Sequence, residues 1–337
     1  MIEVVDGGLL TTVQDGGRPA WTHLGVPIGG ACDPWSLAVA NLLVGNEAGA
    51  AAIEMTIAGP VLAMRSPLVV GLAGADLGGV VAPGGRRLEP GRAHRLDAGS
   101  SISFPGSSGS DGGPPGARGY LSVPGGFDVP PVLGSRSTEL AGAFGGLDGR
   151  PLRAGDHLAP AGPASPPVAL RAWPLLDGDP FGADPASPIC VLRGPAAGLE
   201  ALVAGSWRVA AESDRVGLRL EGGAPMGGAL SAGAAGDGRM ASHGVIFGAV
   251  QVPADGRPIV LLADHQTTGG YPVPAVVASV DRPRLGQLRP GSAVSFVEIG
   301  EEEAVAALAA QRAALERGAT LLREAAGWDA LWESAGG

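Results

Sequence analysis

The densest run of polar side chains and glycines is DHQTTGGYP, residues 264–272, and it follows the apolar stretch PIVLLA, which predicts a strand. Polar residues at the end of a strand, beside glycines that let a ligand approach the backbone, are typical of binding sites. Hydroxyls and bare amides there could bind a carboxylate or a phosphate. A hairpin corner with local threonine hydrogen bonds is the alternative. The candidate substrate-binding residues of this run are Thr267, Thr268, Gly269, Gly270 and Tyr271, and Asp264 is a candidate catalytic carboxylate.

Two segments of the first half place an arginine beside carboxyl or hydroxyl groups. In Gln14-Asp15-Gly16-Gly17-Arg18 the two charged residues could form an ion pair in a structural turn, or the guanidinium could bind a substrate carboxylate. In Gly134-Ser135-Arg136-Ser137-Thr138 the hydroxyls and the arginine suit an oxyanion, and they equally suit a cap of a helix or turn. The candidate substrate-binding residues of these segments are Gln14, Asp15, Arg18, Ser135 and Arg136.

The second half adds a serine, two arginines and a histidine. Arg215 and Arg219 are four apart, so on a strand they would face the same side and could line one cleft with Ser213. Solvated arginines are the alternative. His243, in Ser242-His243-Gly244, is a second candidate catalytic residue, because imidazole titrates nearest to neutral pH and can act as a general base.

Missing residues and motifs exclude several chemistries. All 23 basic residues of the 337-residue chain are arginine, so the chain has no Walker-A lysine, no lysine for a Schiff base and no lysine to carry biotin or lipoate. It has no Gly-x-Ser-x-Gly, HExxH or CxxC motif, which argues against a serine-hydrolase triad and predicts no metal site. Its two cysteines lie far apart and indicate buried free thiols.

Charge and hydropathy indicate a soluble protein. The net charge of −10 argues against non-specific binding to nucleic acid or to an anionic membrane. No apolar run is long enough to span a bilayer, and MIEVVDGG does not look like a signal peptide. We therefore expect a cytoplasmic location.

The elements that must position these residues are mostly short strands. The chain has 58 glycines and 30 prolines but is 45% hydrophobic, which indicates many strands joined by tight turns rather than disorder. Asp33 and Pro34 predict the start of a helix that ends before Gly45, and residues 301–326 predict one long helix. The spacing at QVPADGRPIVLLAD predicts a hairpin that turns at Asp255-Gly256.

Four parts can be delimited along the chain. We expect an N-terminal lobe at 1–165, a linker rich in alanine, proline and glycine at 166–187, a C-terminal lobe at 188–300, and a helix with a tail at 301–337. An acid–arginine–glycine pattern occurs in both lobes, which could be a relic of duplication or chance.

Together the motifs resemble one family, in order and in spacing. They are the segments at 11–46, 120–138, 145–156, 212–222, 251–272 and 285–291. The chain is similar to the biotin-dependent carboxyltransferase-like family, which includes the C subunit of 5-oxoprolinase, or KipA-like proteins, and the C-terminal part of the carboxyltransferase region of urea carboxylase. The resemblance implies a mainly β fold of two cyclophilin-like β-barrel lobes. The family usually has an acidic residue where this chain has His243, and this departure bears on the catalytic role of that position.

The resemblance also implies an activity and partners. Family members of the oxoprolinase type act with an A subunit and a KipI-like B subunit, and use ATP to open 5-oxoproline to L-glutamate. The ATP site could be shared with the KipI-like partner. One alternative is a carboxyltransferase that uses carboxybiotin from a separate carrier, as in urea carboxylase. Another is a regulatory protein that binds a KipI-like protein without catalysis. Because the chain stands alone and has no lysine for biotin, we favour the oxoprolinase role.

Overall fold

The computed structural model describes residues 1–106, 116–162, 171–174, 176–177, 179–180, 187–226 and 241–334. Two compact units make up the chain: unit 1 contains residues 1–17, 33–177 and 313–337, and unit 2 contains residues 18–32 and 178–312. The sequence-based boundaries placed 18–32 in the first lobe and kept the C-terminal helix apart from both lobes. The linker expected at 166–187 lies mostly outside the described residues.

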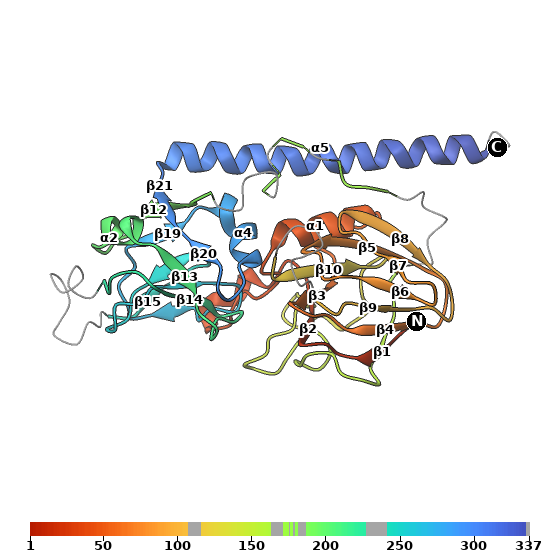
Figure 1. The fold of residues 1–337 in the computed structure, drawn as a ribbon, viewed down its shortest axis with the longest axis horizontal. Helices are drawn as coiled ribbons and strands as arrows, with labels where there is room; N and C mark the ends of the chain where they lie inside the picture. The colour runs from red at the N-terminus through yellow and green to blue at the C-terminus, as the bar shows by residue number, and fades with distance from the viewer. Residues whose placement is uncertain are drawn as a thin grey trace. The chain divides into compact units, whose positions relative to one another are not determined.

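Unit 1 is built from two antiparallel sheets (Figure 1). The six-stranded sheet has the order β11 (His157–Leu158), β1 (Ile2–Asp6), β4 (Val61–Met64), β9 (Ser101–Ser103), β6 (Val80–Ala82) and β7 (Arg86–Arg87). The five-stranded sheet has the order β2 (Leu10–Gln14), β3 (Ala52–Thr56), β10 (Arg118–Ser122), β5 (Leu68–Gly74) and β8 (Arg92–Leu96). The chain passes repeatedly between the sheets, so their inner faces form one core.

Strand alternation divides the five-stranded sheet into an apolar and a polar face. Ile53 and Leu121 pair across β3 and β10 and belong to the core, together with Leu62 of the other sheet. Glu54 and Tyr120, one residue along, pair on the opposite face. Because side chains on a strand alternate between faces, this second face carries buried polar groups outside the apolar core.

Helix α1 (Pro34–Leu43) begins where the sequence predicted. The Asp33 carboxylate accepts a hydrogen bond from Ser36 N at 2.9 Å, and Pro34 occupies the first turn. The helix packs on β5 and β10 (Figure 1). A Cβ atom at Gly71 of β5 would lie 2.2 Å from the Ala40 carbonyl oxygen, so only glycine permits this close approach.

Unit 2 contains an eight-stranded sheet. Its order is β20 (Ala293–Val294), β13 (Trp207–Val209), β14 (Gly217–Glu221), β17 (Ile259–Leu261), β16 (Ala249–Gln251), β19 (Ala275–Val277), β12 (Ile189–Arg193) and β21 (Phe296–Glu298). The strands at its two edges, β20 and β21, are separated in the chain by Ser295 alone. The sheet must therefore curl until its edges meet, which gives a nearly closed barrel.

The remaining elements complete the two units. β16 and β17 form the predicted hairpin, with Gln251 opposite Ile259. A two-stranded ribbon pairs β15 (His243–Gly244) with β18 (Thr268–Gly269). The helices among the described residues are η1 (Pro19–Leu24), α1, α2 (Leu199–Ala204), η2 (Ser279–Asp281), α4 (Arg282–Gln287) and α5 (Glu301–Ser334). Strands dominate and helices are few, so the predicted mainly β class is confirmed.

Candidate functional site

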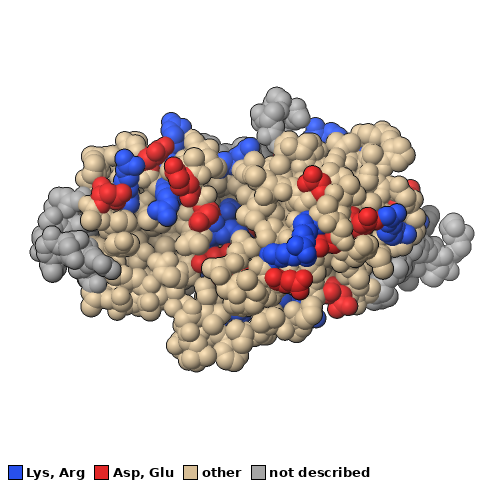
Figure 2. Space-filling view, turned by 90° about the horizontal axis from the view of Figure 1, so that it is seen from below, with Lys and Arg blue, Asp and Glu red and all other residues tan. Residues whose placement is uncertain are grey.

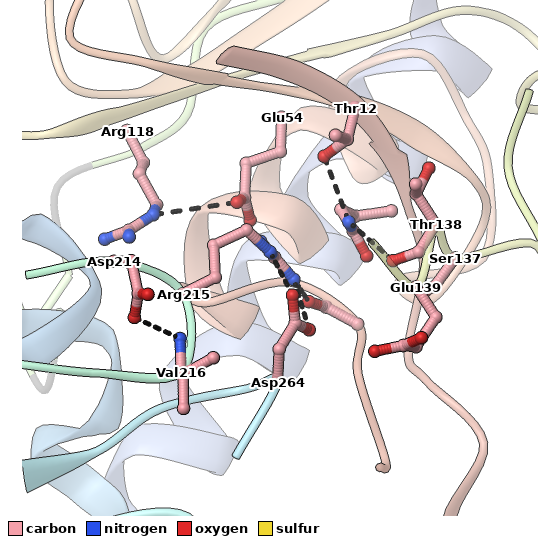
Figure 3. Close-up of polar contacts among 12 residues, drawn as sticks. Thr12, Glu54, Arg118, Ser137, Thr138, Glu139, Asp214, Arg215, Val216 and Asp264 are labelled. Carbon is pink, nitrogen blue, oxygen red and sulfur yellow. Dashed lines mark hydrogen bonds and ion pairs between the residues drawn. The ribbon is translucent and has the colours of Figure 1, made fainter. Parts of the chain in front are cut away.

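Unit 2 contains a buried arginine–aspartate pair (Figure 3). The Arg215 guanidinium donates two hydrogen bonds to the Asp264 carboxylate, from Nε at 2.8 Å and from Nη2 at 3.0 Å. The Asp264 backbone amide in turn donates to the Arg215 carbonyl at 3.0 Å. Their side chains are only 3% and 6% exposed. A two-pronged pair of this kind fixes both the position and the orientation of its charges.

Segment 18–32 brings a second buried arginine to the same place in unit 2. Arg18 is 1% exposed, and a Cβ at Gly29 would lie 3.2 Å from its Nη1 and 3.8 Å from Asp264 Oδ1. The Gly29 amide donates to Ala263 O at 3.1 Å, while Arg215 Nη2 donates to Gly30 O at 2.7 Å. Three distant segments of the sequence therefore meet around the Asp264 carboxylate.

This arrangement holds two permanent cations and one carboxylate out of water. Burial of charges is costly unless they are paired and hydrogen-bonded, so a cluster of this kind is common where proteins bind or transform polar ligands. Gly29 has a φ of 65°, which favours glycine, and its missing side chain lets this turn pack closely against the Arg18 guanidinium. The cluster can bind or orient an anionic or carbonyl oxygen.

The β15–β18 ribbon is a second, more exposed group of predicted residues in unit 2. His243 lies opposite Gly269, and the Val245 amide donates to Thr267 O at 3.1 Å. Thr268 is exposed and Tyr271 is 37% exposed. The structure thus brings the candidate base His243 beside the threonine–glycine run, which begins three residues after Asp264.

In unit 1, Asp15 organises the loop that contains the serine–arginine motif. Its carboxylate accepts hydrogen bonds from Ser135 Oγ at 2.6 Å, from Arg136 N at 2.6 Å and from Ser137 Oγ. Gly17 N donates to the same carboxylate at 2.8 Å. These bonds occupy the carboxylate with local donors, so Asp15 joins two predicted segments of unit 1 and holds their shape.

The neighbours of Asp15 are also engaged within unit 1. Gln14 Nε2 donates to Thr12 Oγ1 at 3.0 Å and to Thr138 O at 3.3 Å. The Arg136 guanidinium donates to Val129 O. The polar groups of 14–15 and 135–138 therefore form one hydrogen-bonded loop system.

Comparison with known proteins identifies the family. The family model described as "Carboxyltransferase domain, subdomain A and B" matches residues 24–298. The chain belongs to this carboxyltransferase-domain family. It is 36% identical to the 5-oxoprolinase C subunit of Escherichia coli K12 over 319 residues, covering 91% of this chain and 94% of the relative.

Some relatives that contain this domain are much longer. The urea amidolyase of Lachancea kluyveri is 30% identical over 93% of this chain, which spans 18% of that protein. The crystal structure of TTHA0988 has a TM-score of 0.75 and 37% identity, and covers 88% of this chain and 56% of that one. The carboxyltransferase domain thus occurs both as a chain of this length and as part of larger chains.

Ser213 and Arg219, two predicted site residues, do not belong to the buried cluster around Asp264. Arg215 precedes β14 rather than lying on it, so the argument from strand spacing does not apply, and Arg219 on β14 is exposed. Ser213 Oγ accepts a hydrogen bond from Arg219 N at 3.0 Å, which closes a local turn. Arg215 and Arg219 therefore differ in both burial and partners.

Sequence reasoning missed a buried histidine and glutamine in the same family domain. His265 is 2% exposed and shares a 2.6 Å hydrogen bond between Nδ1 and Gln266 O. Burial lowers its pKa, and the nearby Arg282 lowers the pKa further. Gln251, also 2% exposed, accepts from Gln266 Nε2 at 3.1 Å. These contacts fix the loop that follows Asp264, and the polar Gln251 in an apolar strand was the available signal.

A charged network on β3 and β10 of unit 1 was missed as well (Figure 3). Tyr120 OH donates to Glu54 Oε2 at 2.6 Å and accepts from Asp33 N at 2.9 Å. Arg118 Nε lies 3.6 Å from Glu54 Oε1, and both side chains are at most 5% exposed. The signal in the sequence was a glutamate in the otherwise apolar AAIEM.

The charge distribution on the surface and the hydropathy of the helices bear on whether the chain has a charged binding face or a membrane span. The face in Figure 2 shows arginines and acidic residues interspersed, without a broad patch of one sign. In the part of the chain that the structure describes, no helix is both long and apolar enough to cross a bilayer.

Proposed function

We propose that this chain is the C subunit of a 5-oxoprolinase, which opens 5-oxoproline to L-glutamate at the expense of ATP. The observation that carries the proposal is the match to the E. coli 5-oxoprolinase C subunit, which extends over nearly the full length of both chains. The urea amidolyase relative matches at lower identity and is several times longer. By identity, the chain is therefore more similar to the oxoprolinase C subunit than to the multidomain urea amidolyase.

The substrate explains why such a protein would bury arginines. 5-Oxoproline has a carboxylate and a stable lactam, so its site needs cations for the carboxylate and donors for the oxyanion that develops on the carbonyl. We assign the arginine–aspartate cluster of unit 2 to this task. Arg18 binds or steers an anionic oxygen, whereas Arg215 is held by Asp264 and orients that carboxylate. His243, Thr267, Thr268 and Gly269 provide the adjacent polar surface, with Gly270 and Tyr271 following.

The residues of unit 1 take a supporting role in this proposal. Asp15, Ser135 and Arg136 shape a loop, and Gln14 joins that loop to β2. Ser213 and Arg219 stay candidates for contact with substrate, although the hydrogen bonds between them are local.

The nucleotide is proposed to bind together with the KipI-like B subunit. Arg215, the buried arginine next to the candidate carboxylate, already donates to Asp264 and to Gly30 O, so it fits an orienting role better than that of a phosphate clamp. The lysine-free chain also has no P-loop lysine. ATP would supply phosphoryl activation of the lactam carbonyl. We expect the A and B subunits, in the cytoplasm, to complete the enzyme.

The test is reconstitution from purified proteins. The chain is combined with the A and B subunits, and ATP-dependent formation of glutamate from 5-oxoproline is measured. We expect turnover from the three-protein mixture and none when this chain is omitted. A folded, assembled complex that forms no glutamate would contradict the proposal.

A second function, carboxyl transfer from carboxybiotin, is favoured by the urea amidolyase relative and by the family description. Without lysine, this chain would need biotin on a separate carrier. Avidin separates the two functions because it sequesters biotin tightly. Oxoprolinase turnover should persist with excess avidin, whereas carboxyl transfer to urea should stop.

A further inference from the structure

Unit 2 has a cavity that includes none of the candidate site residues above. Its volume is about 370 Å³, within the range of small-molecule sites. It is lined by Trp207, Arg208, Glu221, Gly222, Gly223, Pro225, Gly256 and Arg257. Arg215, of the buried cluster, comes just before β14, and Glu221, of the cavity, is the last residue of β14. The buried cluster and the cavity therefore lie at opposite ends of this strand.

A recurring tetrapeptide shows what one of the cavity arginines is suited to bind. Asp-Gly-Arg-Pro occurs at 148–151 and again at 255–258. In unit 1, Arg150 of the first copy donates to both oxygens of Asp156, at 2.7 and 2.8 Å. In unit 2, the guanidinium of Arg257 has no hydrogen-bond or ion-pair partner among the residues that the structure describes, and it lines the cavity. A carboxylate from outside the chain would give Arg257 the partner that Arg150 has.

The other charges of the cavity come from two paired strands. Arg208 of β13 and Glu221 of β14 are directly opposite each other. Arg208 Nη1 donates to Gly291 O at 2.5 Å, which ties this arginine to the segment just before β20. The cavity wall therefore carries two guanidinium groups and one carboxylate.

The apolar wall of the cavity is rigid. Trp207 is 4% exposed, and its indole N–H donates to Leu202 O at 2.8 Å. A Cβ at Gly223 would lie 2.5 Å from the indole ring, and one at Gly205 would lie 2.6 Å from it. Backbone therefore packs directly on the ring, which fixes the position of the indole in the cavity wall.

The geometry points to a binding site for an acidic amino acid, L-glutamate, in this cavity. Two guanidiniums match the two carboxylates of glutamate, and the Glu221 carboxylate matches its ammonium group. The choice of glutamate over other acidic amino acids rests on the proposed function, of which glutamate is the product. The cavity and its charges do not depend on that function. The site would let product bind away from the candidate catalytic residues.

Calorimetric titration of the full chain tests this site without any turnover. At low ionic strength, where exposed charges are least screened, wild-type protein should bind L-glutamate more tightly than glutarate, which lacks the ammonium group. Arg257→Gln should weaken binding of both ligands at least tenfold. Glu221→Gln should remove the preference for glutamate, because the carboxylate that recognises the ammonium group is gone. Arg95→Gln, an exposed arginine on β8 of unit 1, is the matched control and should bind as wild type does.

Three results would overturn the inference. They are the absence of saturable glutamate binding in the millimolar range, equal binding by wild type and Arg257→Gln, and equal affinity of the wild type for glutamate and glutarate. Both substituted side chains are exposed, so thermal melting should show that the variants remain folded. Failure of glutamate binding would leave the reconstitution assay unaffected, and failure of reconstitution would leave the titration unaffected.

Discussion

At the scale of single residues, the buried Arg215–Asp264 pair should contribute to stability as well as to the proposed function. Both side chains are almost fully buried, so Arg215→Ala would leave the Asp264 carboxylate buried without the two hydrogen bonds that Arg215 donates to it. Loss of one partner from a buried ion pair costs about 3–5 kcal/mol, and we expect Arg215→Ala to lower the free energy of unfolding by about that much. Urea denaturation followed by circular dichroism measures the change.

Arg219→Ala is the matched control, because Arg219 is exposed and only four residues away. We expect a change of no more than about 0.5 kcal/mol for this variant. Equal shifts in the two variants would refute the structural role of the buried pair. Arg215→Lys keeps the charge but loses the two-pronged geometry, so it is the better variant for an activity assay.

His265 should make the folded state sensitive to acid. Burial lowers its pKa below the ordinary value of 6.5, so the unfolded chain takes up this proton first as the pH falls. Stability should therefore decrease below about pH 6.5. His265→Gln should give a smaller difference between the free energies of unfolding at about pH 7.5 and about pH 5.5. His94, whose pKa is also lowered by burial, keeps part of the difference. An unchanged difference in the variant would contradict this assignment.

The sequence indicated some of the candidate site residues because their chemistry is local. A polar run after an apolar strand was enough to indicate Asp264, and an arginine after two glycines indicated Arg18. Burial of Glu54 and Arg118 could not be read in the same way, because it depends on which strands pair and which faces are covered. His265 was visible in the sequence, but its lowered pKa follows from burial that only the fold reveals.

At the scale of elements, the contact between α1 and β5 depends on one glycine. A Cβ at Gly71 would lie 2.2 Å from Ala40 O, which is a backbone atom and cannot rotate away. Gly71→Ala should therefore shift α1 and lower the free energy of unfolding by about 1–3 kcal/mol. Gly49→Ala is the control, because its new methyl group would meet nothing within 4 Å. Similar denaturation midpoints for the two variants would show that the helix adjusts without cost.

Local sequence signals were enough to predict individual helices and turns, but they did not predict which strands pair when they lie far apart in the sequence. The Asp33 cap, Pro34 and the Asp255-Gly256 turn are encoded within a few residues, and the structure has the expected helix and hairpin there. The positions of β20 and β21 at opposite edges of one sheet depend on contacts with β13 and β12, far away in the sequence. No local pattern encodes such pairing, so the barrel was expected only from the family resemblance, and the strand order that closes it is seen in the structure.

At the scale of the whole molecule, the chain interleaves its two units. Residues 18–32 belong to unit 2, and Cys32 is part of its core, whereas unit 1 includes residues 313–337. The boundaries expected from the sequence did not assign residues 18–32 to unit 2 or residues 313–337 to unit 1. Neither the glycine-rich segment nor the long helix carries a local signal for the unit on which it packs.

Interleaving predicts that neither half of the sequence folds by itself. A fragment of residues 1–177 would lack α5, whose Gly318 packs on Trp173, and would expose the residues of segment 18–32, including Arg18. We expect this fragment to aggregate or unfold when it is expressed alone, and to become soluble when residues 178–337 are co-expressed. Gel filtration and a cooperative melting transition distinguish the two states. A fragment of residues 1–177 that melts cooperatively by itself would contradict this prediction. It would show that unit 1 folds without α5 and without residues 178–312, which complete the unit that contains segment 18–32.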